Sequence, residues 1–245
     1  MDTITDAPLS TRSQHEKRAD PAAVWSPLAG LTEAAARIAD SGAVAITRGF
    51  DRNGRQRAKA LRELLADRDV AAIEVTPAPG SERLLADTSP AAVVNLIGAG
   101  SWQPYRLAAK LQAPVLTPNP TDGEPASEVQ RDVIGMAGES EPRDVALSHV
   151  AVRPEDSESS SITITNRGEP LSVPGGQVAV TLEDGALRVE LAGPDFAEQS
   201  FTAEQVRVET FDGAHRLVRD ELPIAEFEGA LTLSAEPRGL AVRPV

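Results

Sequence analysis

The residues best suited to chemistry in this sequence form a short glycine-rich turn. An apolar run at residues 91–97 leads into the turn, and a segment with helical periodicity follows it. Glycines let backbone amides approach a ligand closely, and amides at the start of a helix favour an anion such as phosphate. Neither the GxGxxG nor the P-loop pattern is present. The segment therefore predicts either a phosphate-facing loop or an ordinary tight turn, and its residues are Gly98, Ala99, Gly100 and Ser101.

A second polar group follows the first predicted strand, residues 43–46. It contains Arg48 and Asn53, together with Arg52 and Arg55. The carboxyl ends of parallel strands form the ligand crevice of an open α/β sheet, so these side chains are candidates for the same crevice as the glycine-rich turn. Solvated surface arginines are the alternative. We include Arg48 and Asn53, with the four turn residues, among the candidate cofactor-binding residues.

The remaining reactive residue types give weaker signals. Trp102 follows the turn and is expected to pack in the core or a cleft, or to stack on a nucleotide base. The histidines, His15, His149 and His215, lie far apart in the sequence and are expected to be structural. No Gly-x-Ser-x-Gly motif is present, and we assign no catalytic residue. The acidic segment 122–158 predicts a solvated connection; a metal-binding tract is the alternative, although calcium-loop spacing is missing.

Strands and helices alternate in the N-terminal half. Apolar runs predict strands at 43–46, 70–75, 91–97 and 114–116. Helical spacing or capping signals predict helices at 33–39, 52–67, 81–85 and 101–111, with Thr32 and Ser101 as N-caps. This alternation, with short links, is typical of βαβ units and a parallel sheet.

The C-terminal half changes to a period of two. Alternating segments separated by turn signals predict short strands at 162–165, 178–180, 187–191, 206–208, 231–233 and 240–242. Strands at this spacing are typical of an antiparallel β-sandwich. The predicted fold is therefore an α/β domain followed by an all-β domain. The expected divisions are a disordered tail at 1–27, a Rossmann-like domain at 28–121, an acidic connecting region at 122–160 and a β-sandwich at 161–245.

Composition limits the classes of partner. The chain has 245 residues, no cysteine and a net charge of −13. This charge disfavours nucleic acids and anionic membrane surfaces. The missing cysteines exclude disulfides and thiolate catalysis. No run is long enough to span a bilayer, and the polar residues 1–20 do not suggest a signal peptide, so we expect a cytoplasmic protein.

The order of these features resembles the diacylglycerol kinase catalytic fold, a superfamily shared with sphingosine kinases and, more distantly, NAD kinases. The family's "GN…GG…A…DDGxLdv" stretch is similar to residues 166–168, 175–176 and 182–189. Its closing "DGE…PgaLrvl" is similar to residues 227–230 and 236–242. Residues 97–101 take the place of GGDGT, and 114–120 that of "PLGTGN". The resemblance implies a nucleotide in the cleft between the two domains, ATP and Mg²⁺ as candidate cofactors, Asp184 as a structural cation site, and a homodimer.

Two departures from the family motifs bear on activity. The Asp of GGDGT is Ala99 here, and the Glu of DGE is Ala230. A lipid kinase must accept a proton from a hydroxyl and hold Mg²⁺ on the phosphates, so both losses weaken the expected chemistry. The sequence therefore predicts a catalytically impaired relative that binds a nucleotide, a phosphate or a lipid headgroup. An active ATP-dependent lipid kinase and an interaction protein without a small-molecule site are the alternatives.

Overall fold

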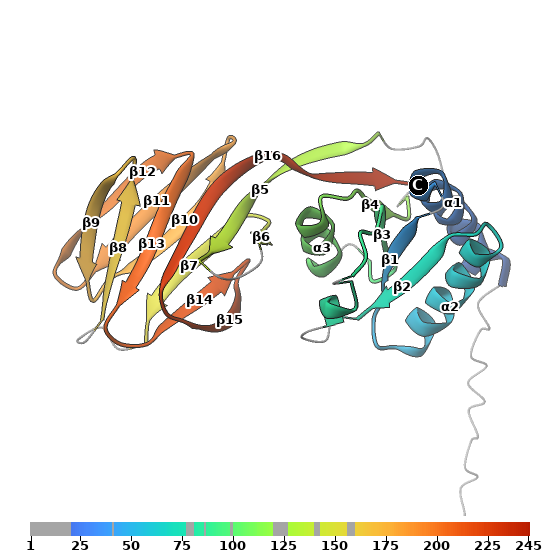
Figure 1. Ribbon diagram of the computed structural model, residues 1–245, viewed down its shortest axis with the longest axis horizontal. Coiled ribbons are helices and arrows are strands. Elements are labelled where there is room, and N and C mark those ends of the chain that lie inside the picture. Colours follow the sequence, from blue (N-terminus) through green and yellow to red (C-terminus); the bar gives the residue numbers. More distant parts are fainter. Residues whose placement is uncertain are drawn as a thin grey trace, which may run out of the picture.

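The protein consists of two lobes joined by a pair of long strands (Figure 1). The structure is a computed structural model that describes residues 21–40, 42–76, 81–85, 87–98, 100–119, 127–139, 143–155 and 160–245. A mainly parallel α/β lobe precedes a lobe of antiparallel sheets, which confirms the predicted fold class. None of the helices in these described ranges combines the length and apolar character that a membrane span requires.

The N-terminal lobe is built on a parallel sheet in the order β2-β1-β3-β4. Its strands are β1 (Ala43–Thr47), β2 (Ala71–Val75), β3 (Ala92–Asn95) and β4 (Val115–Thr117). Its helices are α1 (Pro21–Ala39), α2 (Arg52–Ala66), the 3₁₀ helix η1 (Ser81–Leu85) and α3 (Gln103–Leu111). Alternate residues of a strand face opposite sides, so Ile46 packs with α1 and α2 whereas Ala45 packs with η1 and α3.

Helix starts differ from the sequence prediction at two of the helices. Helix α1 begins at Pro21, and Thr32 lies inside it, where its hydroxyl donates to the carbonyl of Leu28 at 2.7 Å. Helix α3 begins at Gln103 after Trp102, and no side chain caps it, so Ser101 is not its N-cap. Cap-type residues also occur inside helices when the hydroxyl bonds back to the preceding turn. The sequence predicted a disordered tail at 1–27, but residues 21–27 belong to α1; the part before Pro21 lies outside the described residues.

The C-terminal lobe is a β-sandwich. One layer contains β16-β13-β8-β9, with β5 paired to β16 and β6 paired to β5, and the other has the order β12-β11-β10-β7-β14-β15. The first layer's strands are β5 (Val129–Gly138), β6 (Asp144–Ala146), β8 (Ser161–Asn166), β9 (Glu169–Pro174), β13 (Gln205–Phe211) and β16 (Ala230–Pro244). The second layer's strands are β7 (His149–Pro154), β10 (Gln177–Glu183), β11 (Ala186–Gly193), β12 (Phe196–Ala203), β14 (His215–Arg219) and β15 (Leu222–Phe227). Inward-facing aliphatic side chains of both layers form one core cluster.

Strand β16 runs through both lobes. Its first part pairs with β13 and β5, and its last residues pair in parallel with β4, with Val242 opposite Val115. The sequence predicted two strands here with a turn at 237–239. The structure has one strand with a register shift between Glu236 and Leu240, and Arg238 takes a φ of +54°. A bulge accommodates turn-type residues without ending a strand, which explains the difference.

The acidic segment contributes three strands to the lobes. Strands β5, β6 and β7 all lie within residues 122–160, where the sequence predicts a solvated connection that contains one short strand at 145–152. Val133, Val145 and Val150 are buried, and the charged residues of the same segment take exposed or half-buried positions. The high charge content of the segment therefore obscured the short apolar runs that form these strands. Strands β9, β12, β14 and β15 were also absent from the sequence prediction.

Candidate functional site

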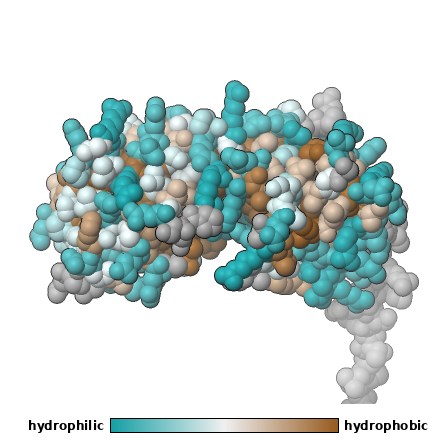
Figure 2. All heavy atoms as spheres, in the orientation of Figure 1, coloured by the Kyte–Doolittle hydropathy of each residue, from teal (hydrophilic) through white to brown (hydrophobic). Residues whose placement is uncertain are grey.

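A cleft of about 440 Å³ opens between the two lobes. The N-terminal lobe contributes Ser101, Trp102 and Tyr105 from the start of α3. The C-terminal lobe contributes Arg131, Asp132, Leu147, Ser148 and Leu240. In Figure 2 the surface is indented where the lobes meet. Of the residues singled out in the sequence, Ser101 and Trp102 line this cleft.

Aromatic side chains form the wall on the α3 side. Trp102 keeps 46% of its surface exposed, and Tyr105 follows three residues later, half-buried against the core. Residues three apart in this region lie on the same side of a helix start. An exposed indole lining a cleft offers a flat apolar surface to a ring-shaped ligand.

Charged side chains of β5 form the opposite wall. The Oδ1 atom of Asp132 accepts a hydrogen bond from the backbone amide of Arg238 at 2.9 Å. A Cβ placed on Gly185 would lie 3.5 Å from Asp132 Oδ2, so the β10–β11 turn adjoins this carboxylate. Arg131 has no ion-pair or hydrogen-bond partner within the part of the chain that the structure describes. The wall thus presents one cation and one partly satisfied carboxylate.

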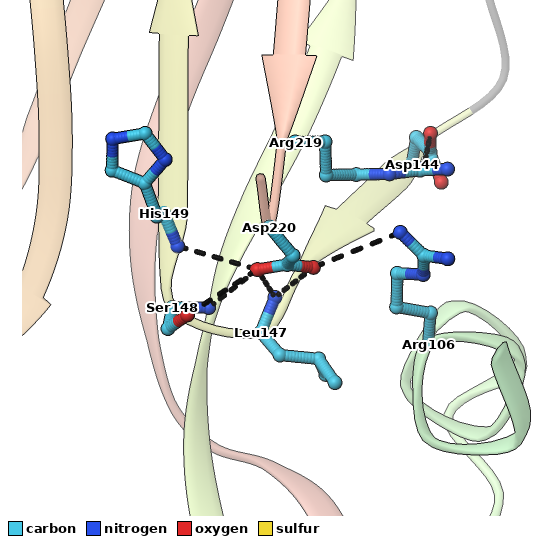
Figure 3. A network of polar contacts seen from close by, with 7 residues as sticks. All are labelled: Arg106, Asp144, Leu147, Ser148, His149, Arg219 and Asp220. Carbon is cyan, nitrogen blue, oxygen red and sulfur yellow. Dashed lines mark hydrogen bonds and ion pairs between the residues drawn. The ribbon is translucent and has the colours of Figure 1, made fainter. Parts of the chain in front are cut away.

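A buried carboxylate, Asp220, fixes the floor of the cleft (Figure 3). It lies in the turn between β14 and β15 and accepts the amides of Leu147 at 3.0 Å, Ser148 at 2.9 Å and His149 at 3.3 Å. The guanidinium of Arg106 on α3 lies 3.9 Å from the same carboxylate. Leu147 and Ser148 line the cleft, so Asp220 holds their loop in place and ties it to the other lobe.

The side chain of Arg106 is largely shielded from solvent. Burial lowers the pKa of Arg106, and the nearby Arg219 adds to this effect while Asp220 opposes it. Arg219 is itself paired with Asp144 at the start of β6. The two arginines and two carboxylates therefore balance one another across the lobe boundary (Figure 3).

The glycine-rich turn is organised by the side chain of Asn95, which is 1% exposed. Its Oδ1 accepts the amides of Ile97 at 2.9 Å and Gly98 at 3.1 Å, and its Nδ2 donates to the Gly98 carbonyl at 3.2 Å. Gly98 takes a φ of +113°, which side chains rarely tolerate. Two amides of this region are thus used internally. Ala99 lies outside the described residues, and Gly100 is exposed.

Arg48 and Asn53 lie away from the cleft lining. Arg48 donates from Nε to Glu74 of β2 at 2.7 Å and from its Nη1 to the Gly49 carbonyl at 3.1 Å. Asn53 is exposed in the first turn of α2. Asp51 caps that helix by accepting the Gly54 amide at 2.7 Å, and this hydrogen bond lowers the pKa of Asp51. A carboxylate therefore already stands at the start of α2, where an anion would otherwise be favoured.

The positions that correspond to the family's acidic residues are spread over the molecule. Asp184 is exposed in the turn of the β10–β11 hairpin with a φ of +50°, and the next residue, Gly185, adjoins the cleft residue Asp132. Ala230 starts β16, and Leu240 reaches the cleft ten residues later. At about 3.3 Å per residue this separation is on the order of 30 Å. Among the described residues, no group of three or more metal-ligating side chains comes together.

The histidines lie in different settings. His215 is fully buried on β14, and neither ring nitrogen has a hydrogen-bond partner among the described residues. Burial lowers its pKa. His149 contributes its backbone amide to the Asp220 network, and its ring points away from the carboxylate (Figure 3).

The cleft wall formed by β5 was missed by the sequence analysis. Arg131 and Asp132 fall in the segment assigned to a connection, and Ser148 and Asp220 look like surface turn residues. The apolar run 133–136, directly after Asp132, is the signal that marks the strand. Its pairing with β16, more than 90 residues later, is not visible locally.

Comparison with known proteins gives limited likenesses. No family model and no curated protein sequence matches the chain. Among solved structures it is similar to an NAD kinase from Archaeoglobus fulgidus in complex with ATP, with 16% identity, 82% of this chain and 93% of that chain covered, and a TM-score of 0.47. It is also similar to 2,5-dihydroxypyridine dioxygenase from Pseudomonas putida KT2440, with 10% identity, coverage of 86% and 91%, and a TM-score of 0.28. Sheep galectin-11 in complex with glycerol has 13% identity, coverage of 47% and 93%, and a TM-score of 0.10.

Proposed function

We propose that the chain binds a nucleoside-containing ligand in the cleft between its lobes and does not transfer phosphate. The observation that carries this proposal is the exposed Trp102 on one wall of the cleft, opposite Arg131 and Asp132. Clefts of about 300–1,000 Å³ suit small molecules, and the cleft here is of that size. An aromatic surface, a cation and a hydrogen-bond acceptor match the base, the phosphate and the sugar of a nucleotide.

The base would lie on the aromatic wall. Stacking on an aromatic side chain is worth about 1–3 kcal/mol per base and tolerates different bases. A lipid headgroup or free phosphate would use Arg131 but would gain little from Trp102. The effect of removing the indole therefore separates a nucleoside ligand from the other two classes.

The acidic side chains of the described residues are poorly placed for phosphoryl transfer. The reaction needs a positioned base and metal-held phosphates. Asp220 is occupied by three amides and Arg106, so it is not free to accept a proton from a substrate. The Glu228–Ala230 segment, which resembles the family's DGE, starts the strand whose other end reaches the cleft. Asp132 and Asp184 are the acids left beside the cleft, and they define the enzyme alternative.

Fluorescence of Trp102 gives a direct test. In a Trp25→Phe background Trp102 is the one remaining tryptophan, because the chain has two. We expect nucleosides or nucleotides to change its emission and to raise the melting temperature, as ligands of the folded state must. Trp102→Ala, followed by calorimetry, should weaken binding about 5- to 150-fold, the equivalent of one stacked base.

Phe211→Ala is the matched control. Phe211 is 48% exposed at the Ala230 end of the C-terminal lobe, and its loss should leave binding unchanged. If no nucleoside, nucleotide or NAD binds at millimolar concentration, the nucleoside proposal is wrong. Phosphorylation of diacylglycerol or NAD that disappears in Asp132→Asn would instead establish the kinase alternative.

A further inference from the structure

We infer that the cleft selects a ligand of low negative charge, a nucleoside or a nucleoside monophosphate, over di- and triphosphates. This inference rests on the proposed function, because it assumes that a nucleoside occupies the cleft. It follows from the balance between cations and anions that the described residues place around the cavity.

One unpaired cation lines the cleft among the described residues, and it is Arg131. Arg106 lies nearby, but it faces Asp220 at 3.9 Å and is half-buried. The side chain of Arg238 lines a different hollow, between the end of α3 and β16. The described lining of the cleft therefore offers one guanidinium to a ligand phosphate.

Three residues near this cation offer no backbone donor to a ligand. The amides of Ile97 and Gly98 are occupied by Asn95. The first turn of α3 contains Pro104, which has no N–H to donate. The series of amides from this turn into α3 that a polyphosphate would contact is therefore interrupted at Pro104.

One carboxylate lines the cleft next to Arg131, and it belongs to Asp132. A second, exposed carboxylate is that of Asp184, which precedes Gly185, the turn residue that adjoins Asp132. A monophosphate carries about −1.5 to −2 charge at neutral pH, and each further phosphate adds about one more negative charge. Arg131 offsets about one of these charges, and the additional charges of a di- or triphosphate would meet the carboxylates in a partly desolvated space. The whole chain, at −13, adds a repulsive background.

The same carboxylate favours a neutral sugar. Asp132 uses Oδ1 for the Arg238 amide, which leaves Oδ2 to accept a hydrogen bond from a ligand hydroxyl or amino group. Ionised acceptors make the stronger hydrogen bonds, so a sugar hydroxyl gains from Asp132 where a phosphate loses. One residue therefore attracts the nucleoside part and repels extra phosphates.

Isothermal calorimetry on the full chain tests this selection. The probes are adenosine, guanosine, cytidine and uridine, then the 5′-mono- and triphosphates of the best nucleoside, with EDTA and separately with Mg²⁺. We expect the nucleoside and its monophosphate to bind at least about tenfold more tightly than the triphosphate in EDTA, a difference of about 1.4 kcal/mol. Arg131→Gln should weaken binding of the monophosphate by a larger factor than binding of the nucleoside.

Replacing a carboxylate by an amide should change the affinities for the nucleoside and for the triphosphate differently. Asp132→Asn keeps an oxygen for the Arg238 amide, and it should weaken the nucleoside while strengthening the triphosphate. Asp184→Asn should strengthen the triphosphate and leave the nucleoside unchanged. Asp212→Asn is the control, since Asp212 is also exposed in a turn, with a φ of +49° against +50° for Asp184.

The outcomes separate the two proposals. A triphosphate that binds more tightly than its nucleoside, with or without Mg²⁺, overturns the charge selection and leaves the nucleoside cleft standing. Equal binding of all three ligands, unaffected by Asp132→Asn or Asp184→Asn, also overturns it. Failure of every probe to bind overturns the proposed function itself. Matching melting temperatures of the variants show that folding is intact, and the exposed Asp184 provides a variant in which folding is not at risk.

Discussion

Replacing Asp220 by glycine removes the carboxylate that joins the two lobes at the cleft floor. Asp220 has a φ of +46°, which glycine adopts without strain, so the variant tests the side chain and not the backbone. The lost contacts are three amide hydrogen bonds and the ion pair with Arg106. Removing one partner of a buried pair costs about 3–5 kcal/mol because the other charge stays buried.

The cost should appear in thermal and urea unfolding. For a chain of this length each kcal/mol corresponds to about 2–4 °C in melting temperature, so we expect a fall of about 6–20 °C. Asp220→Asn keeps an acceptor for the amides and should cost less. Combining Asp220→Gly with Arg106→Gln should cost less than the sum of the single changes, since the unpaired cation is gone.

Asp212→Gly supplies the control for the glycine itself. Asp212 has a φ of +49° but is exposed, so its replacement should change stability by well under 1 kcal/mol. Equal effects of Asp220→Gly and Asp212→Gly would refute the account of the cleft floor. A strictly additive double variant with Arg106→Gln would show that the ion pair contributes nothing.

Three further predictions concern individual buried side chains and the bulge. The pKa of His215 is lowered in the folded chain, so at pH values just below the usual histidine pKa the unfolded chain binds more protons than the folded chain, and stability falls as the pH drops through that range. His215→Leu should remove up to about 1.4 kcal/mol per pH unit of this dependence of stability on pH. The measurement is the difference between variant and wild-type urea unfolding at pH 5 to 7. Asn95→Ala should cost about 1–3 kcal/mol in chemical denaturation, because the Ile97 and Gly98 amides lose their acceptor; an unchanged midpoint would show that water replaces it. Arg238→Gly should stabilise the chain by up to about 1 kcal/mol in the same assay, since its φ of +54° suits glycine, whereas a destabilised variant would mean that the side chain contributes more than the backbone strain.

The sequence predicts the α/β lobe well because its signals are local. Each strand there is a short apolar run bounded by turns, and α2 begins where Asp51 caps it and ends within a residue of the predicted boundary. Two of the turn signals, Asn-Arg-Gly and Glu-Asp-Gly, fall in hairpin turns, where Arg167 and Asp184 take positive φ values. Turn-forming residues and hydrophobic periodicity act over a few residues, so their effect on local structure does not depend on distant parts of the chain.

Only part of the candidate site can be predicted from the sequence, because only some of its residues carry local signals. Ser101 and Trp102 were found because they adjoin the glycine-rich turn. Asp220 was not, because Arg219-Asp220-Glu221 has the composition of a solvated turn, and its burial depends on a loop 70 residues earlier. Long-range pairing decides both the cleft floor and the β5 wall.

The path of β16 constrains how the molecule is made. The sheet of the first lobe gains the strand next to β4 from residues 242–244, which follow all the strands of the second lobe in the sequence. A growing polypeptide that has released everything up to β15 therefore still lacks one strand of the lobe that it began with. The first lobe completes its sheet only after the second lobe has been synthesised. The two lobes should therefore fold and unfold together and not as independent domains.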